Sequence, residues 1–281
     1  MIVALESVLL ERLCIPNAVV FRRSTMRRTI QYRVVDSGNE STSAVATQFI
    51  QQLQLPSQKK GVVYVRSYAT GEIISDALGC PFYKATADDK AKVLEQWKRA
   101  GGWIVATGAL RTGINIEGII YVVHVGRPYG LTSFMQQSGR GGRDGEVSES
   151  VIFVRVQNSH DWRGQRRKEV LCAYSVEEAD EEAMTAFILT STCRRKVLSQ
   201  YMDQASGEHS AATDCISTDS VYCDRCKATN KPRADLQRIA RAEPRAEPRA
   251  KPSGRYFIEQ QLRATREEYD AMMQVIDELQ G

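Results

Sequence analysis

Two arginines lie three residues apart among glycines in the segment QQSGRGGRDG, residues 136–145. Arg140 and Arg143 are the two arginines, and a guanidinium donates paired hydrogen bonds in a plane that suits a phosphate group. An arginine that reaches a nucleotide held by a neighbouring domain stabilises negative charge on the γ-phosphate during transfer. If a short helix at 131–137 ends at these glycines, both guanidinium groups project from one exposed edge, which favours a phosphate contact. Composition alone leaves the alternative of a surface turn rich in Gly and Arg.

Four of the seven cysteines form the pattern C-x21-C-x7-C-x2-C, which comprises Cys193, Cys215, Cys223 and Cys226. Four thiolates satisfy tetrahedral zinc, and a C-x2-C pair is a common chelating half of such a site. A site filled by four protein ligands is structural, because it leaves no position for water. The pattern predicts structural zinc, with Cys215 as the least typical ligand and His209 as its substitute. The alternative is free cysteines in a disordered segment.

Regular alternation of apolar strands and helices surrounds the arginine motif. Continuous apolar runs predict buried strands at 61–66, 103–107, 119–125 and 151–156. Helical patterns lie at 40–55, 71–78, 88–99, 131–137 and 176–202. Apolar strands separated by helices indicate a parallel sheet covered on both faces. The predicted fold is therefore α/β, with the short helix 131–137 ending at the glycines of the arginine motif.

The composition of the 281 residues, with 42% hydrophobic and 26% charged residues, is that of a soluble globular chain and argues against a membrane protein. The net charge of +4 hides an uneven distribution, because residues 227–255 carry nine Lys or Arg against three Asp or Glu. The repeat RAEPRAEPRAKP at 241–252 predicts a stiff, solvated linker. Apolar positions at helical spacing then predict an amphipathic helix over 256–281.

Four motifs together resemble the RecQ family of superfamily 2 ATP-dependent DNA helicases. Residues 136–145 resemble its motif VI, residues 104–128 resemble motif V, and residues 61–67 resemble motif IV. The segment FRRSTMRRTIQYRVV, residues 21–35, resembles the connector after the first motor domain. The resemblance runs from about residue 15 to about residue 226, and it includes the cysteines.

The resemblance implies a RecA-like parallel sheet between helices, which is the second motor lobe, followed by a small helical zinc-binding subdomain. The predicted division of the chain is a remnant of the first lobe and connector at 1–35, the lobe at 36–160, the zinc-binding subdomain at 161–230, an Arg/Pro-rich linker at 231–255 and a flexible tail ending in the helix 256–281.

On the nucleotide side, the resemblance makes Arg143 the arginine finger and Arg140 its companion at the γ-phosphate. Gln136 would couple the nucleotide state to the cleft between the lobes, and Gly113 and Asn115 would line the far wall of that cleft. The implied cofactor is ATP with Mg²⁺, bound mainly by a first lobe.

On the DNA side, the resemblance implies that Ser67 and Thr107 contact the strand backbone. Arg66 precedes the motif IV serine, whereas the family usually has an arginine after it, where this chain has Tyr68. Lys84 replaces a family histidine. The variant motifs resemble those of RecQ-like helicases of fungal chromosome ends.

In the zinc-binding subdomain of this family, a helix that begins CRR precedes the clustered cysteines. The resemblance implies zinc on the four cysteines, with Arg194, Arg195 and Lys196 presented to nucleic acid. The alternative for these three residues is a solvated helix face.

The sequence contains no Gly-Lys pair, which a phosphate-binding P-loop needs, and the acidic letters DEEA at 180–183 lie in a helical pattern rather than after a strand. We therefore expect the C-terminal part of a nuclear, ATP-dependent 3′–5′ DNA helicase, inactive alone, whose first lobe is supplied in cis or by a longer transcript. Its processes would be DNA repair and recombination. The alternatives are a non-catalytic zinc-containing DNA-binding module, or an interaction protein whose terminal helix pairs with another chain.

Overall fold

A computed structural model describes residues 10–15, 17–19, 24–111, 116–156, 176–203 and 213–228. The chain divides into two compact units, residues 1–242 and 243–281. The predicted linker at 231–255 and helix at 256–281 lie outside the described residues. In the part that is described, no helix has the length and apolar character needed to cross a membrane.

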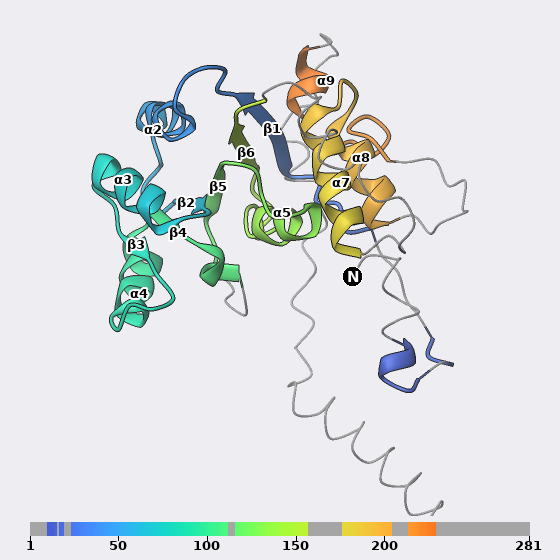
Figure 1. Ribbon diagram of the computed structural model, residues 1–281, viewed down its shortest axis with the longest axis horizontal. Coiled ribbons are helices and arrows are strands. Elements are labelled where there is room, and N and C mark those ends of the chain that lie inside the picture. Colours follow the sequence, from blue (N-terminus) through green and yellow to red (C-terminus); the bar gives the residue numbers. More distant parts are fainter. Residues whose placement is uncertain are drawn as a thin grey trace, which may run out of the picture. The chain divides into compact units, whose positions relative to one another are not determined.

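Six parallel strands form one sheet (Figure 1). In spatial order they are β1 (Ile30–Asp36), β6 (Ser148–Val154), β5 (Ile119–Val125), β2 (Lys60–Val65), β4 (Gly102–Ala106) and β3 (Phe82–Tyr83). The runs rich in Val and Ile form the central strands because both of their faces are buried, as in parallel sheets with helices on each side. The predicted α/β fold with a parallel sheet is confirmed.

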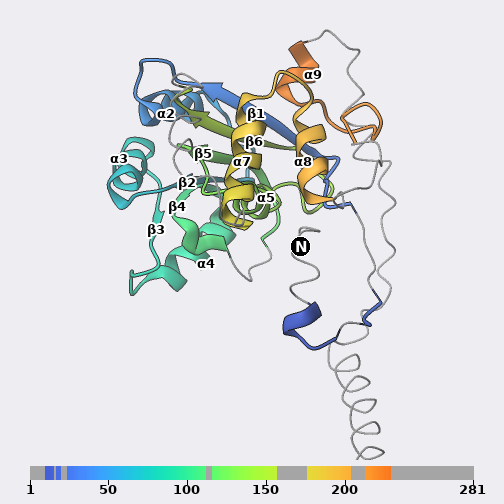
Figure 2. The ribbon, with the colours of Figure 1, turned by 45° about the vertical axis from the view of Figure 1, so that its right-hand side comes forward.

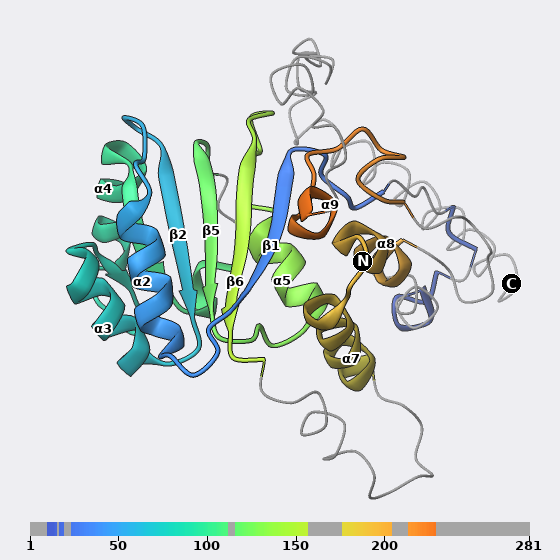
Figure 3. The same cartoon turned by 90° about the horizontal axis from the view of Figure 1, so that it is seen from above.

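Helices cover both faces of the sheet (Figure 3). The helical elements are α2 (Thr42–Gln52), α3 (Tyr68–Leu78), α4 (Lys90–Ala100), the 3₁₀ turn η2 (Gly108–Arg111), α5 (Leu131–Ser138), α7 (Val176–Leu189), α8 (Arg194–Met202) and α9 (Asp224–Ala228). Alternate strand residues face opposite layers, so Val63 and Val123 pack with α2 and α3, whereas Val62 and Val122 pack with α4.

The sheet begins earlier in the chain than the sequence predicted. We expected the lobe to start at residue 36, but β1 (Ile30–Asp36) already pairs with β6 along its whole length. The side chains of Ile30 and Tyr32 are buried in the core. The last part of the predicted connector is therefore an edge strand, because burying these two side chains stabilises it in the sheet.

The predicted continuous helix at 176–202 is interrupted. It is two helices, α7 and α8, that meet at residues 190–193 (Figure 2). The Thr190 hydroxyl accepts a hydrogen bond from the backbone N–H of Thr192, and Cys193 has extended backbone angles. Ser and Thr side chains compete for backbone groups in this way and favour helix ends over helix interiors.

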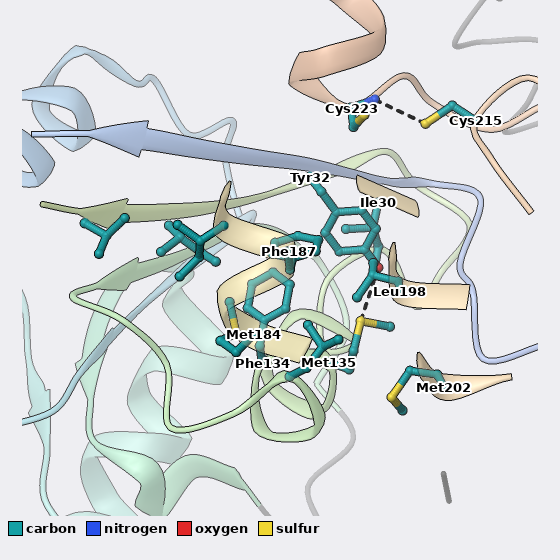
Figure 4. Close-up of a cluster of buried hydrophobic side chains, with 14 of the residues drawn as sticks. Ile30, Tyr32, Phe134, Met135, Met184, Phe187, Leu198, Met202, Cys215 and Cys223 are labelled. Carbon is teal, nitrogen blue, oxygen red and sulfur yellow. Dashed lines mark hydrogen bonds between the residues drawn. The ribbon is translucent and has the colours of Figure 1, made fainter. Parts of the chain in front are cut away.

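A shared hydrophobic core joins α5, α7 and α8 to the edge of the sheet. The rings of Tyr32, Phe134 and Phe187 lie 5.0 to 6.1 Å apart between centroids (Figure 4). Leu198 and Met202 of α8 complete this cluster. Through these side chains the helix pair α7–α8 packs directly against the sheet. Buried aromatic rings contribute much of the packing energy of such a core.

Candidate functional site

The arginine motif forms a tight turn directly after α5, as the sequence predicted, but only one of its two arginines is exposed. Arg143 is exposed, whereas Arg140 is 3% exposed. A Cβ atom at Gly141 would lie 2.7 Å from the Ser148 hydroxyl oxygen, and Gly142 has a φ of +62°. Because these glycines have no side chains, the turn packs closely against the start of β6, and Arg140 is buried. The expectation that both guanidinium groups project from one exposed edge is therefore wrong for Arg140.

Positive charge gathers around Arg143. Partial burial and the nearby charges of Arg27 and Arg140 lower the pKa of Arg143. Arg27 comes from the segment before β1, and its guanidinium lies 3.5 Å from the carbonyl oxygen of Gly141. Three like charges held close together favour a bound anion, because an anion relieves their repulsion. Sequence reasoning missed Arg27, and its only signal was an arginine-rich connector.

Helix α5 is fixed from the buried side by a histidine. His124 Nε2 lies 3.0 Å from Oε1 of Gln137, and both side chains are buried. The neighbouring Gln136 is exposed, as a residue that faces a cleft must be. The His124–Gln137 contact sets the rotation of α5 and thereby places Gln136 on the outer side.

His124 predicts a pH-dependent stability. Burial lowers the pKa of His124 to about 4, against about 6.5 in an unfolded chain. The unfolded state therefore binds a proton first as pH falls, and the free energy of unfolding decreases by roughly 3 kcal/mol between pH 7 and 4. Urea unfolding of the wild type and His124→Gln, measured at several pH values, checks this. The variant should lose this part of the pH dependence, and equal pH profiles would contradict the assignment.

The start of α5 is held by α7. The Asp180 carboxylate accepts hydrogen bonds of 2.8 Å from the backbone N–H and the hydroxyl of Thr132, in the first turn of α5. A Cβ atom at Gly130 would lie 1.9 Å from this carboxylate. A carboxylate at a helix N-terminus is stabilised by the helix dipole. Residue 180 thus lies on a helix, as the pattern at 180–183 predicted, and serves as a cap.

The predicted DNA contacts lie at the carboxyl edge of the sheet, whereas the arginine turn packs against the start of β6. Ser67 follows β2 directly and caps α3, with its Oγ accepting a hydrogen bond from the Thr70 N–H. Thr107 directly follows the neighbouring strand β4. The exposed Arg66 lies with its guanidinium 4.4 Å from the centre of the Tyr129 ring. The structure thus gathers the predicted DNA residues at one edge.

The predicted motif V residues Gly113 and Asn115 lie outside the described residues. The ends of their loop are described, and the Gly118 backbone N–H donates to Asp144 at 3.2 Å. The Gly142 N–H donates to the Ile119 carbonyl at 3.0 Å. These bonds join the end of the motif V loop to the arginine turn.

The four predicted zinc ligands come together. The Sγ atoms of Cys193, Cys215, Cys223 and Cys226 all lie within 4.8 Å of one another. Tetrahedral zinc with bonds of about 2.3 Å requires sulfur atoms about 3.8 Å apart, and Cys193 lies 3.5 Å from Cys215 and 4.0 Å from Cys223. Hydrogen bonds with the Cys215 and Cys223 thiols lower the pKa of Cys193. The donor set and spacing therefore fit zinc, and His209, the substitute ligand, lies outside the described residues.

The arginines of the CRR helix point inward, which corrects the prediction that they are presented to nucleic acid. Arg194 and Arg195 are buried, and only Lys196 is exposed. Arg195 donates to backbone carbonyls of the connector, of Ile30 and of Val221. Buried guanidinium groups need such acceptors, since an unpaired buried charge costs several kcal/mol. The two arginines tie the cysteine loop to the sheet.

Arg194 forms a two-pronged ion pair with Asp224, which lies between the last two cysteines. The two bonds measure 2.6 and 2.8 Å, and Asp224 also accepts from the Val34 N–H of β1. Breaking a buried pair leaves one charge uncompensated, so Arg194→Met should lower the free energy of unfolding by about 3–5 kcal/mol.

The matched control for this prediction is Lys196→Met, an exposed residue on the same helix, which should change stability by less than about 0.5 kcal/mol. Urea denaturation of both variants provides the measurement. Similar midpoints for the two variants would show that the buried pair does not hold this region together.

Comparison with known proteins gives a consistent result. Residues 39–145 match the helicase conserved C-terminal domain. The chain is 27% identical over 234 residues to the ATP-dependent DNA helicase Q-like 4B of Arabidopsis thaliana, covering 76% of this chain and 20% of that protein. It is 29% identical over 178 residues to the ATP-dependent DNA helicase RecQ of Haemophilus influenzae, covering 60% and 27%. For RecQ of Pasteurella multocida the values are 30% over 161 residues, 54% and 25%.

Among solved structures, S. cerevisiae Dbp5 bound to RNA and ADP BeF3 aligns with 68% of this chain and 52% of its own, at 15% identity and a TM-score of 0.46. The chain spans between 20% and 27% of the length of the three curated relatives named above. The chain thus contains, at residues 39–145, a domain that matches the helicase conserved C-terminal domain, and it is similar in sequence to DNA helicases of the RecQ type.

Proposed function

We propose that the chain is the second motor lobe and zinc-binding subdomain of an ATP-dependent 3′–5′ DNA helicase. The observation that carries the proposal is the exposed Arg143 in a cluster with Arg27 and Arg140, on the turn of motif VI. Ser67 and Thr107 stand at the carboxyl edge of the same sheet. Separate sites for the nucleotide and the strand are what a two-lobed motor requires.

In this proposal Arg143 stabilises the γ-phosphate of ATP held with Mg²⁺ by a first lobe, because negative charge builds up there during transfer. Arg140 acts beneath it as a buried positive charge, and Gln136, on the outer side of α5, senses the closing of the cleft. Ser67, Arg66 and Thr107 contact phosphates of the DNA backbone and position the strand without reading its sequence.

Zinc on the four cysteines would be structural in this proposal. A nuclear location, a role in DNA repair and recombination, and the likeness to helicases of fungal chromosome ends remain predictions. A protein partner for the helix 256–281 also remains a prediction.

The isolated chain is expected to lack ATPase activity, because its sequence has no Gly-Lys pair to bind phosphate. The test is a chimera in which the first lobe of the Haemophilus influenzae relative precedes residues 24–281 of this chain. DNA-stimulated ATP hydrolysis by the chimera supports the proposal. Hydrolysis by the isolated chain that Arg143→Ala abolishes, or an inactive but folded chimera, would refute it.

The second candidate is a non-catalytic DNA-binding module, which the positive charge of residues 227–255 favours. Binding through such a segment is sequence-independent and weakens steeply with salt. A salt series of DNA affinity with and without residues 227–281 tests it. If the shortened chain still binds DNA, the lobe itself provides the binding. If the deletion abolishes binding, the result favours the non-catalytic DNA-binding module.

A further inference from the structure

The carboxyl edge carries more than phosphate contacts. Tyr129 lies in the loop that follows β5, and Tyr68 begins α3 after β2. Strands β5 and β2 are hydrogen-bonded neighbours in the sheet, so their carboxyl ends lie about 5 Å apart. The two tyrosines therefore lie in neighbouring segments at the same edge, and Tyr68 is the next residue after Ser67.

Both tyrosines are exposed, unlike the other aromatic residues in the described part of the chain. Tyr129 is 52% exposed and Tyr68 is 44% exposed. Large aromatic side chains gain by burial, so two of them exposed at the same edge of the sheet suggest a surface for a ligand. Neither belongs to any of the three hydrophobic clusters of the core.

A cation accompanies each ring. The Arg66 guanidinium lies 4.4 Å from the ring centre of Tyr129. The Lys84 ammonium lies 6.0 Å from the ring centre of Tyr68 and 4.9 Å from that of Phe82, which Tyr68 contacts edge-on. Arg66 also approaches the Arg127 carbonyl at 3.5 Å, and Lys84 forms an ion pair of 2.7 Å with Glu72. These contacts hold the cations beside the rings, at the edge that also carries the Ser67 hydroxyl.

Alternation of aromatic rings and cations is the arrangement that binds single strands. Bases stack on the rings, because every base has a flat face, while the cations attract the adjoining phosphates. A double helix offers no such faces, since its bases are stacked on one another. The chemistry of this edge thus selects a strand whose bases are separated.

We infer that Tyr129 and Tyr68 are stacking platforms for unstacked bases of single-stranded DNA, at the edge that carries the proposed backbone contact of Ser67. The inference rests on the proposed function, since it assumes that this edge faces the translocating strand. It adds a base contact where the motif resemblance implies only backbone contacts. It also gives a role to two positions where this chain departs from the usual motif, Tyr68 and Lys84.

The test compares two strands that differ only in their bases. Fluorescence anisotropy measures the affinity of the full chain for an oligothymidylate of about 12 nucleotides and for an abasic strand of equal length and charge. The basic segment at 227–255 attracts the phosphates of both strands equally, so the ratio of the two affinities isolates stacking.

The wild type should bind the oligothymidylate about 5- to 150-fold more tightly than the abasic strand, the range for stacking of one base. Tyr129→Leu should lower this ratio at least several-fold, and Tyr68→Leu should act in the same direction. Tyr129→Phe keeps the ring and should retain the ratio. Ile73→Ala, which removes an exposed apolar side chain of α3, is the matched control and should also retain it.

Circular dichroism and thermal unfolding confirm that each variant is folded. A wild-type ratio near one, with DNA bound, overturns the stacking inference and leaves the proposed backbone contacts standing. An unchanged ratio in both Tyr129→Leu and Tyr68→Leu overturns it as well. Failure of the full chain to bind either strand overturns both this inference and the proposed DNA contact.

Discussion

Chelation of zinc from the metal-loaded chain is expected to unfold residues 193–203 and 213–228, which carry the four cysteines, and to loosen their attachment to the sheet. Cys215, Cys223 and Cys226 are buried, and their sulfur atoms lie within 4.8 Å of one another. Without bonds to a metal, the thiols are not expected to stay this close. Structural zinc contributes about 10–16 kcal/mol of apparent binding free energy in small zinc domains. A region with so little apolar core of its own should therefore depend on it.

The measurement combines zinc content, expected at one ion per chain, with hydrogen exchange before and after chelation. Cys215→Ser should reproduce the effect of the chelator. Cys80→Ser is the matched control, because Cys80 is partly buried in another cluster beside α3 and away from the four ligands. A zinc-free chain with unchanged exchange protection at residues 193–203 and 213–228 would contradict the prediction.

Two buried arginines attach the cysteine loop to the sheet, and they explain why unfolding of this loop should also affect the sheet. Arg195 donates to the Ile30 carbonyl at the start of β1, and Arg194 pairs with Asp224, which also binds the Val34 N–H. Helix α7, in turn, caps α5 through Asp180. Hydrogen bonds thus connect the segment with the four cysteines to β1, and they connect the preceding helix α7 to α5, which ends at the arginine turn.

Much of this architecture could be predicted from the sequence, for physical reasons. Buried strands of a parallel sheet are continuous apolar runs, and the predicted strand at 119–125 matches β5 at both ends. The cysteine cluster was also predictable, because metal ligands in short spacings have few other uses. Motif spacing indicated the position of the arginine turn, whose glycines permit its close approach to β6.

The inward arginines could not be predicted, because burial depends on tertiary contacts that no local pattern records. Arg194, Arg195 and Lys196 are adjacent and similar in sequence, yet only Lys196 reaches solvent. The difference arises from the acceptors around the first two, which come from residues 27, 28, 30, 187, 188, 221 and 224. Arg140 is buried for a similar reason, because the turn packs against Ser148.

The break between α7 and α8 illustrates the same limit. The apolar spacing of 176–202 fits one helix, and the residues 190–192 that end α7 are weak helix formers rather than strong breakers. Packing decides the matter, because two short helices can bury Phe187 and Leu198 in the same core (Figure 4).

The largest functional effect is expected from Arg143. In the chimera with a first lobe, Arg143→Ala should lower kcat for ATP hydrolysis by about 10³- to 10⁵-fold, the range measured for arginine fingers. Because the contact forms mainly with the charge that develops in the transition state, KM for ATP should change little.

Arg155→Ala is the matched control, since Arg155 is an exposed arginine of the same lobe whose guanidinium binds carbonyls of residues 39 and 40. It should leave kcat within about twofold. A steady-state assay with saturating single-stranded DNA distinguishes the outcomes, and equal kcat values for the two variants would remove Arg143 from the reaction. Arg27→Ala in the same assay should give an intermediate loss, because Arg27 lies beside the arginine turn and adds positive charge near Arg143 without belonging to the motif itself.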